Sequence, residues 1–362
     1  MVFVLIANSL SRIGTTLGLR EVVEAYSSTT NTSPSALALQ RMTSIAHNTI
    51  EHEELLRAYW MTEMLDSIST IGSKHQLGFL QAPINPLLPC SDWIWSQAET
   101  VIGEYPLRPS HYSSAFSLCV MLALSELQTV QTFVRKPVAM DVYEERDAWQ
   151  SEAQKIDESL TNWRGEFVAG VYRLINAEKT NIERPEMDPF FVLTNCVLNT
   201  AVITLLQRRA PCPPGIDTLA DSWAFASNRC VYACENMAFK VRQMTESEML
   251  CCNPHLLFSI FVAARFYTVH SKALDADVPV NLHSLAFALH VSGKRWQLAR
   301  SYENVIRIAV ADYRTPIALS KVPREFYDLT FSTFEIADQL TQWADGLGSD
   351  ESPAFGTELM SS

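Results

Sequence analysis

Apolar residues recur every three or four positions through most of this sequence, and no alternating apolar and polar run is framed by hairpin turns. That period is typical of amphipathic helices rather than strands. Glycine supports the same assignment, because only 12 of the 362 residues are glycine, less than half the usual ~7%. Doubly wound and barrel folds use glycine at their tight strand-to-helix turns. The sequence therefore predicts an all-α, irregular multi-helix fold.

Periodicity and capping signals together place the helices. We expect them at 2–18, 34–47, 50–73, 91–102, 111–135, 145–175, 188–208, 217–244, 254–273, 282–291 and 294–311, with one or two more between 323 and 345. Two of these begin where a capping side chain precedes a proline at the first helical position, at Asp188-Pro189 and at Asn253-Pro254.

The segments between the expected helices are short. Proline and polar clusters punctuate the chain, but none is long enough to act as a flexible linker between domains. We therefore expect one helical domain over residues 1–345. Residues 346–362 contain Gly, Ser and Pro and little apolar surface to bury, so that tail is predicted to be disordered.

Charge and cysteine usage limit the classes of partner and compartment. The 28 Lys and Arg residues against 40 Asp and Glu give a formal charge of −12, the opposite of what a phosphate-binding surface needs. The N-terminus has no basic segment or cleavage site of a signal peptide. The eight cysteines are therefore predicted to be reduced thiols of a cytosolic or nuclear protein. The nearest candidate for a membrane span, Leu256 to Val269, is interrupted by Arg265, so we expect a soluble chain without a membrane span.

No phosphate loop, dinucleotide fingerprint, nucleophile elbow or zinc-protease motif occurs in the sequence. The nearest acid/base constellation is His47, Glu51, His52, Glu53 and Glu54, in which His47 and Glu51 are spaced to share a helix face. Such a set is more typical of the polar face of an amphipathic helix. We therefore expect no catalytic residues, no cofactor and no enzyme.

Cysteines offer a second constellation. Cys230 and Cys234 have helical spacing, and Cys251, Cys252 and His255 follow. Thiolates at such spacing can share a tetrahedral zinc. However, cysteine is among the residue types most often buried, and these lie among apolar residues. We interpret them as core residues and predict no metal site.

Aromatic residues are numerous enough to line an apolar cavity between helices. The candidates are Trp60, Trp93, Trp95, Phe258, Phe261, Phe266 and Tyr267. Aromatic residues at helical spacing are more often plain core, which is the interpretation we favour.

The helix expected at 50–73 has a clear apolar stripe. Leu56, Trp60 and Met64 lie four residues apart and predict one packed face, with Glu53 and Glu63 facing elsewhere.

A longer pattern covers residues 54 to 93. Residues 54 to 66 read Glu-Leu-Leu-Arg-Ala-Tyr-Trp-Met-Thr-Glu-Met-Leu-Asp, Ile71-Gly72 follows, and Pro86-Leu87-Leu88-Pro89-Cys90 precedes Trp93. This pattern resembles the fungal-specific transcription factor domain, the middle homology region of fungal zinc-cluster regulators. The residues that match the family's signature are Arg57, Trp60, Leu65, Asp66, Leu88, Pro89 and Cys90. Arg57 and Asp66 are too far apart to pair along one helix turn, so each is expected to find a partner elsewhere.

Weaker similarity extends over roughly residues 4–312, and there are departures. The family's DNA reader is a binuclear zinc cluster with C-x2-C-x6-C spacing, whereas the first cysteine here is Cys90. On this resemblance we expect the first helices of the family's domain to be trimmed at the N-terminus. Ser67 stands where the family commonly has Arg, and Ser73-Lys74 replaces Arg-Pro.

The resemblance implies a regulator similar to those of fungal secondary-metabolite gene clusters. Without its own zinc-cluster reader, it would act through protein partners, either a zinc-cluster transcription factor or a co-activator, and would meet DNA only indirectly. The nucleus is the implied location, with the cytoplasm as the alternative. Three other possibilities stay open: a small-molecule effector, a helical scaffold repurposed as a small-molecule-binding protein or pathway enzyme, and a truncated zinc-cluster factor.

Overall fold

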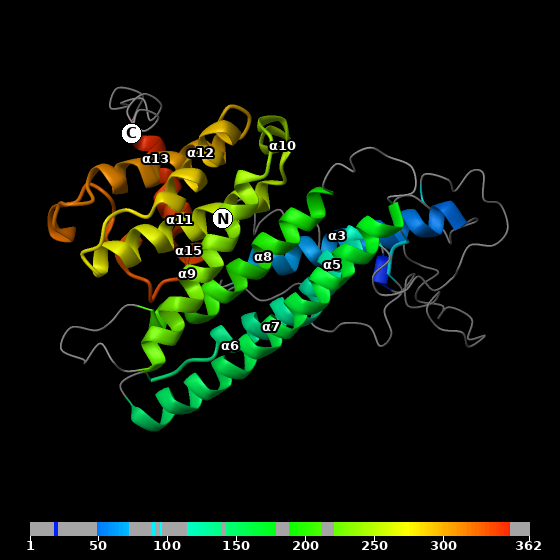
Figure 1. The fold of residues 1–362 in the computed structure, drawn as a ribbon, viewed down its shortest axis with the longest axis horizontal. Helices are drawn as coiled ribbons and strands as arrows, with labels where there is room; N and C mark the ends of the chain where they lie inside the picture. The colour runs from blue at the N-terminus through cyan, green and yellow to red at the C-terminus, as the bar shows by residue number, and fades with distance from the viewer. Residues whose placement is uncertain are drawn as a thin grey trace. The chain divides into compact units, whose positions relative to one another are not determined.

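A computed structural model describes residues 18–20, 49–71, 88–90, 95, 114–139, 142–178, 188–210 and 221–347. Within these ranges the chain is helical apart from turns and short connections, and it contains no strand (Figure 1). The all-α prediction is therefore confirmed. The helices expected at 2–18, 34–47 and 91–102 lie outside the described residues, apart from Gly18 and Trp95.

The chain divides into two compact units. The first unit comprises residues 1–132 and 158–194, and the second comprises residues 133–157 and 195–362. The single helical domain over 1–345 stays a prediction, as does the disordered tail.

In the first unit, α3 (Thr49–Thr70) packs against α5 (Ala115–Leu122) and the π-helix η2 (Ala123–Leu127), which continues into α6 (Gln128–Val134). The expected helix at 111–135 is thus a helical run whose middle is π-helical. The Ser67 hydroxyl donates to the Ala123 carbonyl across 3.0 Å at the start of that π segment. This bond joins α3 to the point where the helix changes its hydrogen-bond pattern.

Two long helices each contribute to both units. They are α7 (Tyr143–Glu178) and α8 (Pro189–Leu206), the latter followed by the 3-10 turn η3 (Gln207–Arg209). The predicted cap at the start of α8 is confirmed, because an Asp188 carboxylate oxygen accepts the Phe190 N–H across 2.8 Å.

The second unit surrounds α11. Its further elements are α9 (Asp221–Arg242), α10 (Glu246–Cys251), α11 (Pro254–Ala273), α12 (Val280–Gly293), α13 (Gln297–Ala311), η4 (Ile317–Leu319), α14 (Arg324–Tyr327) and α15 (Thr333–Gly346). Helix α11 packs against α9, α12 and α13, and its side chains are buried from His255 to Ser271. The predicted Asn253 cap is confirmed, since its side chain accepts the His255 N–H across 2.9 Å.

Two expectations about helices need correction. The sequence reading missed α10, although Thr245 and Glu248 form the reciprocal capping box that marks a helix start. It also missed two segments that are long and apolar enough to cross a membrane, Ala115–Val134 and Pro189–Arg209. Their most apolar windows are 56% and 83% buried, as in the core helices of a folded protein.

Candidate functional site

The signature residues converge on α3 in the first unit. Arg57 Nε donates to Glu53 Oε1 across 2.9 Å, and Arg57 Nη2 donates to the Cys90 carbonyl across 2.9 Å. The Cys90 N–H donates to the same Glu53 oxygen across 2.9 Å. These three bonds form a closed brace, which we call the Arg57 brace, between one turn of α3 and the segment at Cys90. The Arg57 guanidinium also lies over the Trp95 ring, 5.4 Å from its centroid.

The Arg57 brace corrects one prediction. Glu53 was expected to face away from the packed stripe, yet its exposed fraction is 4%. Its burial is tolerated because its carboxylate receives a guanidinium and a backbone N–H. Helical spacing places Arg57 one turn from Glu53, but it cannot show the Cys90 N–H, which lies 37 residues further along the chain.

The segment Leu88 to Cys90 is also joined to α5. The Ser117 hydroxyl donates to the Pro89 carbonyl across 2.9 Å, and Leu88 is buried. Ser117 lies in the first turn of α5, where its N–H is accepted by the capping Ser114 hydroxyl. Three of the seven signature residues thus form one connection between α3 and α5.

The other signature residues lie along α3. Trp60 is fully buried against Tyr59, with ring centroids 4.7 Å apart, and Asp66 is 1% exposed. Leu65 is only half-buried. The structure therefore brings Arg57 and Cys90 into direct contact and places Trp60 and Asp66 in the core.

A buried acid lies between these residues on α3. Glu63 was expected to face elsewhere, but it is 7% exposed. Burial, with a smaller contribution from Asp66, raises the pKa of Glu63 to about 8 against the opposing effects of Tyr59 and Arg20. The physical reason differs from that at Glu53, whose carboxylate is held by hydrogen bonds. A carboxyl group can be buried when it is neutral, and a sequence pattern does not show its protonation state.

The three constellations considered at the sequence level do not assemble into sites within the described residues. His47 and the His52 side chain lie outside them, and Glu53 belongs to the Arg57 brace. Cys230 and Cys234 are buried in α9, where desolvation raises the pKa of both thiols. No group of three or more His, Cys, Asp or Glu residues in the described part is placed to hold a metal ion.

The aromatic candidates are divided between the two units. Phe261 stacks on Tyr302 with centroids 4.2 Å apart, and Phe266 stacks on His270 at 5.2 Å. These pairs fill the core around α11 in the second unit, whereas Trp60 belongs to the first. Trp93 lies outside the described residues.

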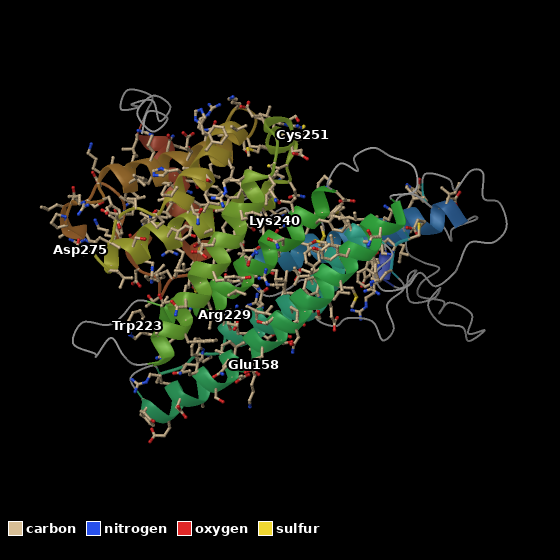
Figure 2. The ribbon with its side chains drawn as sticks, in the orientation of Figure 1. Glu158, Trp223, Arg229, Lys240, Cys251 and Asp275 are labelled. Atoms are coloured by element: carbon tan, nitrogen blue, oxygen red, sulfur yellow. The ribbon has the colours of Figure 1, made fainter. Side chains whose placement is uncertain are left out.

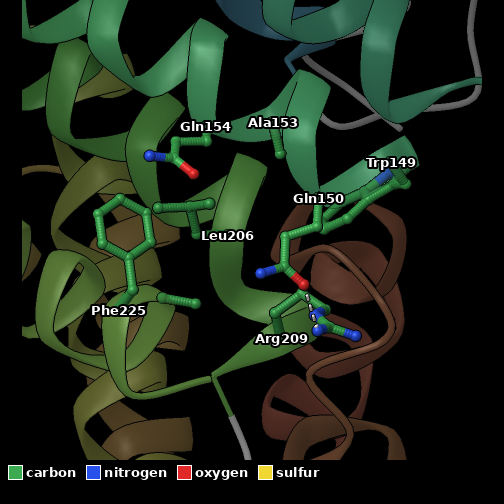
Figure 3. Close-up of a pocket in the computed structure, with 8 residues that line it drawn as sticks. Trp149, Gln150, Ala153, Gln154, Leu206, Arg209 and Phe225 are labelled. Atoms are coloured by element: carbon green, nitrogen blue, oxygen red, sulfur yellow. Dashed lines mark hydrogen bonds between the residues drawn. The ribbon is translucent and has the colours of Figure 1, made fainter. Parts of the chain in front are cut away.

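Sequence reasoning missed a surface hollow in the second unit. Its volume is about 320 Å³, and its lining comprises Trp149, Gln150, Ala153, Gln154, Leu206, Arg209, Phe225 and Ala226 (Figure 3). Arg209 Nη2 donates to Gln150 Oε1 across 2.9 Å within it. Desolvation, with a smaller contribution from Arg146, lowers the pKa of Arg209. The hollow offers apolar walls and one engaged cation, without a group placed for catalysis.

Arg265 is the most deeply buried cation among the residues of the second unit that the structure describes. Its guanidinium donates to the carbonyls of Glu325, Phe326, Asp328 and Phe331 and to the Thr333 hydroxyl at 2.6 to 3.1 Å. Burial lowers the pKa of Arg265 to about 9, opposed by Asp328 and Glu335. The sequence showed Arg265 only as an interruption of an apolar run. In the fold it fixes the segment between α14 and α15 onto α11.

Comparison with known proteins gives one informative relative. The chain is 40% identical over 296 residues to the notoamide biosynthesis cluster transcriptional coactivator notQ' of Aspergillus versicolor. The matched region is 82% of this chain and 48% of that protein, so the chain spans about half the length of the curated relative. No protein-family profile and no solved structure matches the chain. The similarity fits a regulator, and the likeness to the fungal-specific transcription factor domain rests on the signature residues alone.

Proposed function

We propose that this chain regulates transcription of a fungal secondary-metabolite pathway through protein partners. The observation that carries the proposal is the 40% identity, over 82% of the chain, to a protein named as a biosynthesis-cluster coactivator. The resemblance of residues 54 to 93 to the fungal-specific transcription factor domain supports it independently. On this proposal the chain works in the nucleus and is not an enzyme.

Charge supports partner-mediated action. The formal charge of −12 opposes unaided binding to phosphates. Helix α7 exposes carboxylates along its first turns at Glu144, Glu145 and Asp147, and a fourth, at Glu152, is paired with Lys136. These charges suit electrostatic attraction of a basic protein surface. The partner we propose is a zinc-cluster transcription factor or a co-activator subunit.

The Arg57 brace has a structural role in this proposal. It holds the Leu88 to Cys90 segment against α3 and α5, and the set Arg57, Trp60, Leu65, Asp66, Leu88, Pro89 and Cys90 serves as a folding signature rather than as a binding site. The engaged carboxylate of Glu53 and the buried indole of Trp60 support this assignment.

A tethering assay tests the regulatory function. The chain is fused to an unrelated DNA-binding domain, and a reporter carrying that domain's target site is measured in a fungal host. We expect reporter output to change several-fold relative to the domain alone. The same chain without the fused domain is the matched control and should leave the reporter unchanged. An unchanged reporter with the folded fusion bound at the promoter would contradict the proposal.

A mobility-shift assay tests the partner requirement separately. The purified chain should show no sequence-specific DNA binding by itself at submicromolar concentration. Addition of the factor recovered with it from DNase-treated nuclear extract should restore a specific shift. Tight, specific binding by the chain alone would contradict indirect action on DNA.

A further inference from the structure

Helix α9 carries a stripe of exposed aromatic residues at seven-residue spacing. Phe225, Tyr232 and Phe239 are 39%, 51% and 50% exposed. Asn228 and Glu235 are exposed between them, so positions 225, 228, 232, 235 and 239 follow the three- and four-residue alternation of a helical seam. We call these five residues the α9 stripe.

The opposite side of α9 is packed. Cys230, Cys234, Met237 and Val241 are fully buried there, and α9 contacts α11 and α12. Figure 2 shows Trp223, Arg229 and Lys240 in order along the helix. The α9 stripe is therefore separate from the core face, and three large aromatic side chains in one line are more apolar surface than scattered exposure accounts for.

A seven-residue repeat keeps its members on one side of a helix. Each heptad drifts by only about 20° around an α-helix, and a slight supercoil removes that drift when two helices pair. From Phe225 to Phe239 the stripe extends 14 residues, or about 21 Å. This length and direction suit a second helix lying along α9.

The three aromatic residues of the α9 stripe are spaced symmetrically about Tyr232, whereas Asn228 and Glu235 are not. Phe225 and Phe239 each lie seven residues from Tyr232. In an antiparallel pair of identical helices with the two-fold axis at Tyr232, Phe225 of each copy lies opposite Phe239 of the other. A two-fold interface needs this self-complementarity, because the same patch serves both copies.

The charges at the end of α9 also favour antiparallel pairing. Helix α9 begins at Asp221 and has Lys240 and Arg242 in its last turn. Antiparallel pairing keeps the basic last turns of the two copies apart and aligns the helix dipoles favourably. Parallel pairing would place the basic ends together.

The hollow lined by Trp149 and Leu206 lies at one end of the stripe, since Phe225 is part of its wall (Figure 3). Antiparallel pairing brings the second copy's Phe239 to that end. A cavity of 150 Å³ holds a benzene ring, and this hollow measures about 320 Å³. The hollow therefore has room for the aromatic ring that symmetry places beside it.

We propose that the α9 stripe is a dimerisation face whose occupant is α9 of a second copy, antiparallel and centred on Tyr232. The inference is independent of the regulatory function. One helix pair buries less than the ~1,600 Å² of a standard interface, so we expect a dissociation constant in the micromolar range.

A disulfide-trapping experiment tests the axis. Tyr232→Cys is made in a chain in which the exposed Cys251 is changed to Ser. Because residue 232 lies on the two-fold axis, mild oxidation should give a covalent dimer of more than half the protein. The matched control is Tyr172→Cys in the same background, a tyrosine of α7 that is 65% exposed. Equal trapping of the two variants, or none at position 232, would overturn the proposal.

Sedimentation of the full chain from 1 to 200 µM tests the face. We expect a monomer–dimer equilibrium that Phe239→Glu weakens at least tenfold and that Tyr172→Glu leaves unchanged. Thermal melting followed by circular dichroism confirms that each variant is folded. A chain that stays monomeric over the whole concentration range overturns the proposal. The same holds if the monomeric chain binds another protein through the α9 stripe. A dimer that survives both Phe239→Glu and Tyr232→Arg also overturns it.

Discussion

The first unit buries two glutamates and the second an arginine and a histidine, and in each unit one of the two is charged and the other is neutral. In the first unit, Glu53 is held by Arg57 and the Cys90 N–H, while Glu63 is kept protonated by its surroundings. In the second, Arg265 stays charged and is surrounded by backbone carbonyls, and His255 is kept neutral. The comparison teaches that a buried charge is tolerated here either through dense hydrogen bonding or through loss of the charge.

The largest expected effect comes from removing the charge of Arg265. Arg265→Met keeps much of the side-chain volume but leaves four carbonyls and the Thr333 hydroxyl without their donor. We expect the free energy of unfolding of the second unit to fall by about 3–5 kcal/mol, as when a buried network loses one partner. Urea unfolding measures this.

Arg314→Met is the matched control, because Arg314 pairs with Asp277 on the surface, where both side chains are largely exposed. This variant should lower the free energy of unfolding by less than about 1 kcal/mol. Equal costs for the two variants would show that the buried network contributes nothing beyond a surface pair.

The second prediction concerns Glu63. Its pKa is raised to about 8 in the folded chain from 4.5, so between these values the folded state holds more protons than the unfolded state. The first unit should therefore lose stability as pH rises, by about 3 kcal/mol between pH 5.5 and pH 8. Glu63→Gln should flatten the dependence between pH 5.5 and pH 8.5, measured by urea unfolding. Glu54→Gln, an exposed neighbour, should retain the wild-type slope.

The third prediction has the opposite sign and concerns the second unit. Desolvation lowers the pKa of His255 from 6.5 to about 4, so the unfolded state binds the extra proton between these values. Stability should fall as pH drops, by about 2 kcal/mol between pH 6 and pH 4.5. His255→Gln should reduce that acid sensitivity, and the exposed His290→Gln should not. If the stabilities of the two units changed with pH in the same direction, the predicted difference between them would be wrong.

The fourth prediction sharpens the description of the Arg57 brace. Arg57→Lys keeps the charge but loses the fork that reaches both Glu53 and the Cys90 carbonyl. We expect the free energy of unfolding of the first unit to fall by about 1–2 kcal/mol. Hydrogen exchange at the Cys90 amide should become faster. Arg173→Lys on the exposed side of α7 is the control. Unchanged exchange at Cys90 would contradict the structural role proposed for the signature residues.

The smallest expected effect is at a helix cap of the second unit. Ser332 accepts the Glu335 N–H across 3.2 Å and completes a reciprocal capping box at the start of α15. Ser332→Ala should cost about 1 kcal/mol in thermal or urea unfolding. Ser332→Asp, which keeps an acceptor at the cap, should restore most of that loss.

Local sequence patterns determined most of the helical framework. The expected helix at 254–273 coincides with α11, since Asn253-Pro254 fixes its start and its apolar residues continue to its end. The same patterns placed α3 and α7 within a few residues of their ends. Helix formation depends on hydrogen bonds within four residues and on caps beside them, so its signals lie in short stretches of sequence.

The resemblance identified both Arg57 and Cys90, but only the fold showed the bond between them. Periodicity assigned Glu53 and Glu63 to the outer face of α3, and the tertiary structure buried both. Arg265 could not be interpreted alone, because its acceptors lie 60 to 68 residues further along the chain. The sequence by itself determined where the helices are, whereas tertiary packing decided which charges are buried, because burial depends on partners that are distant in sequence and close only after folding.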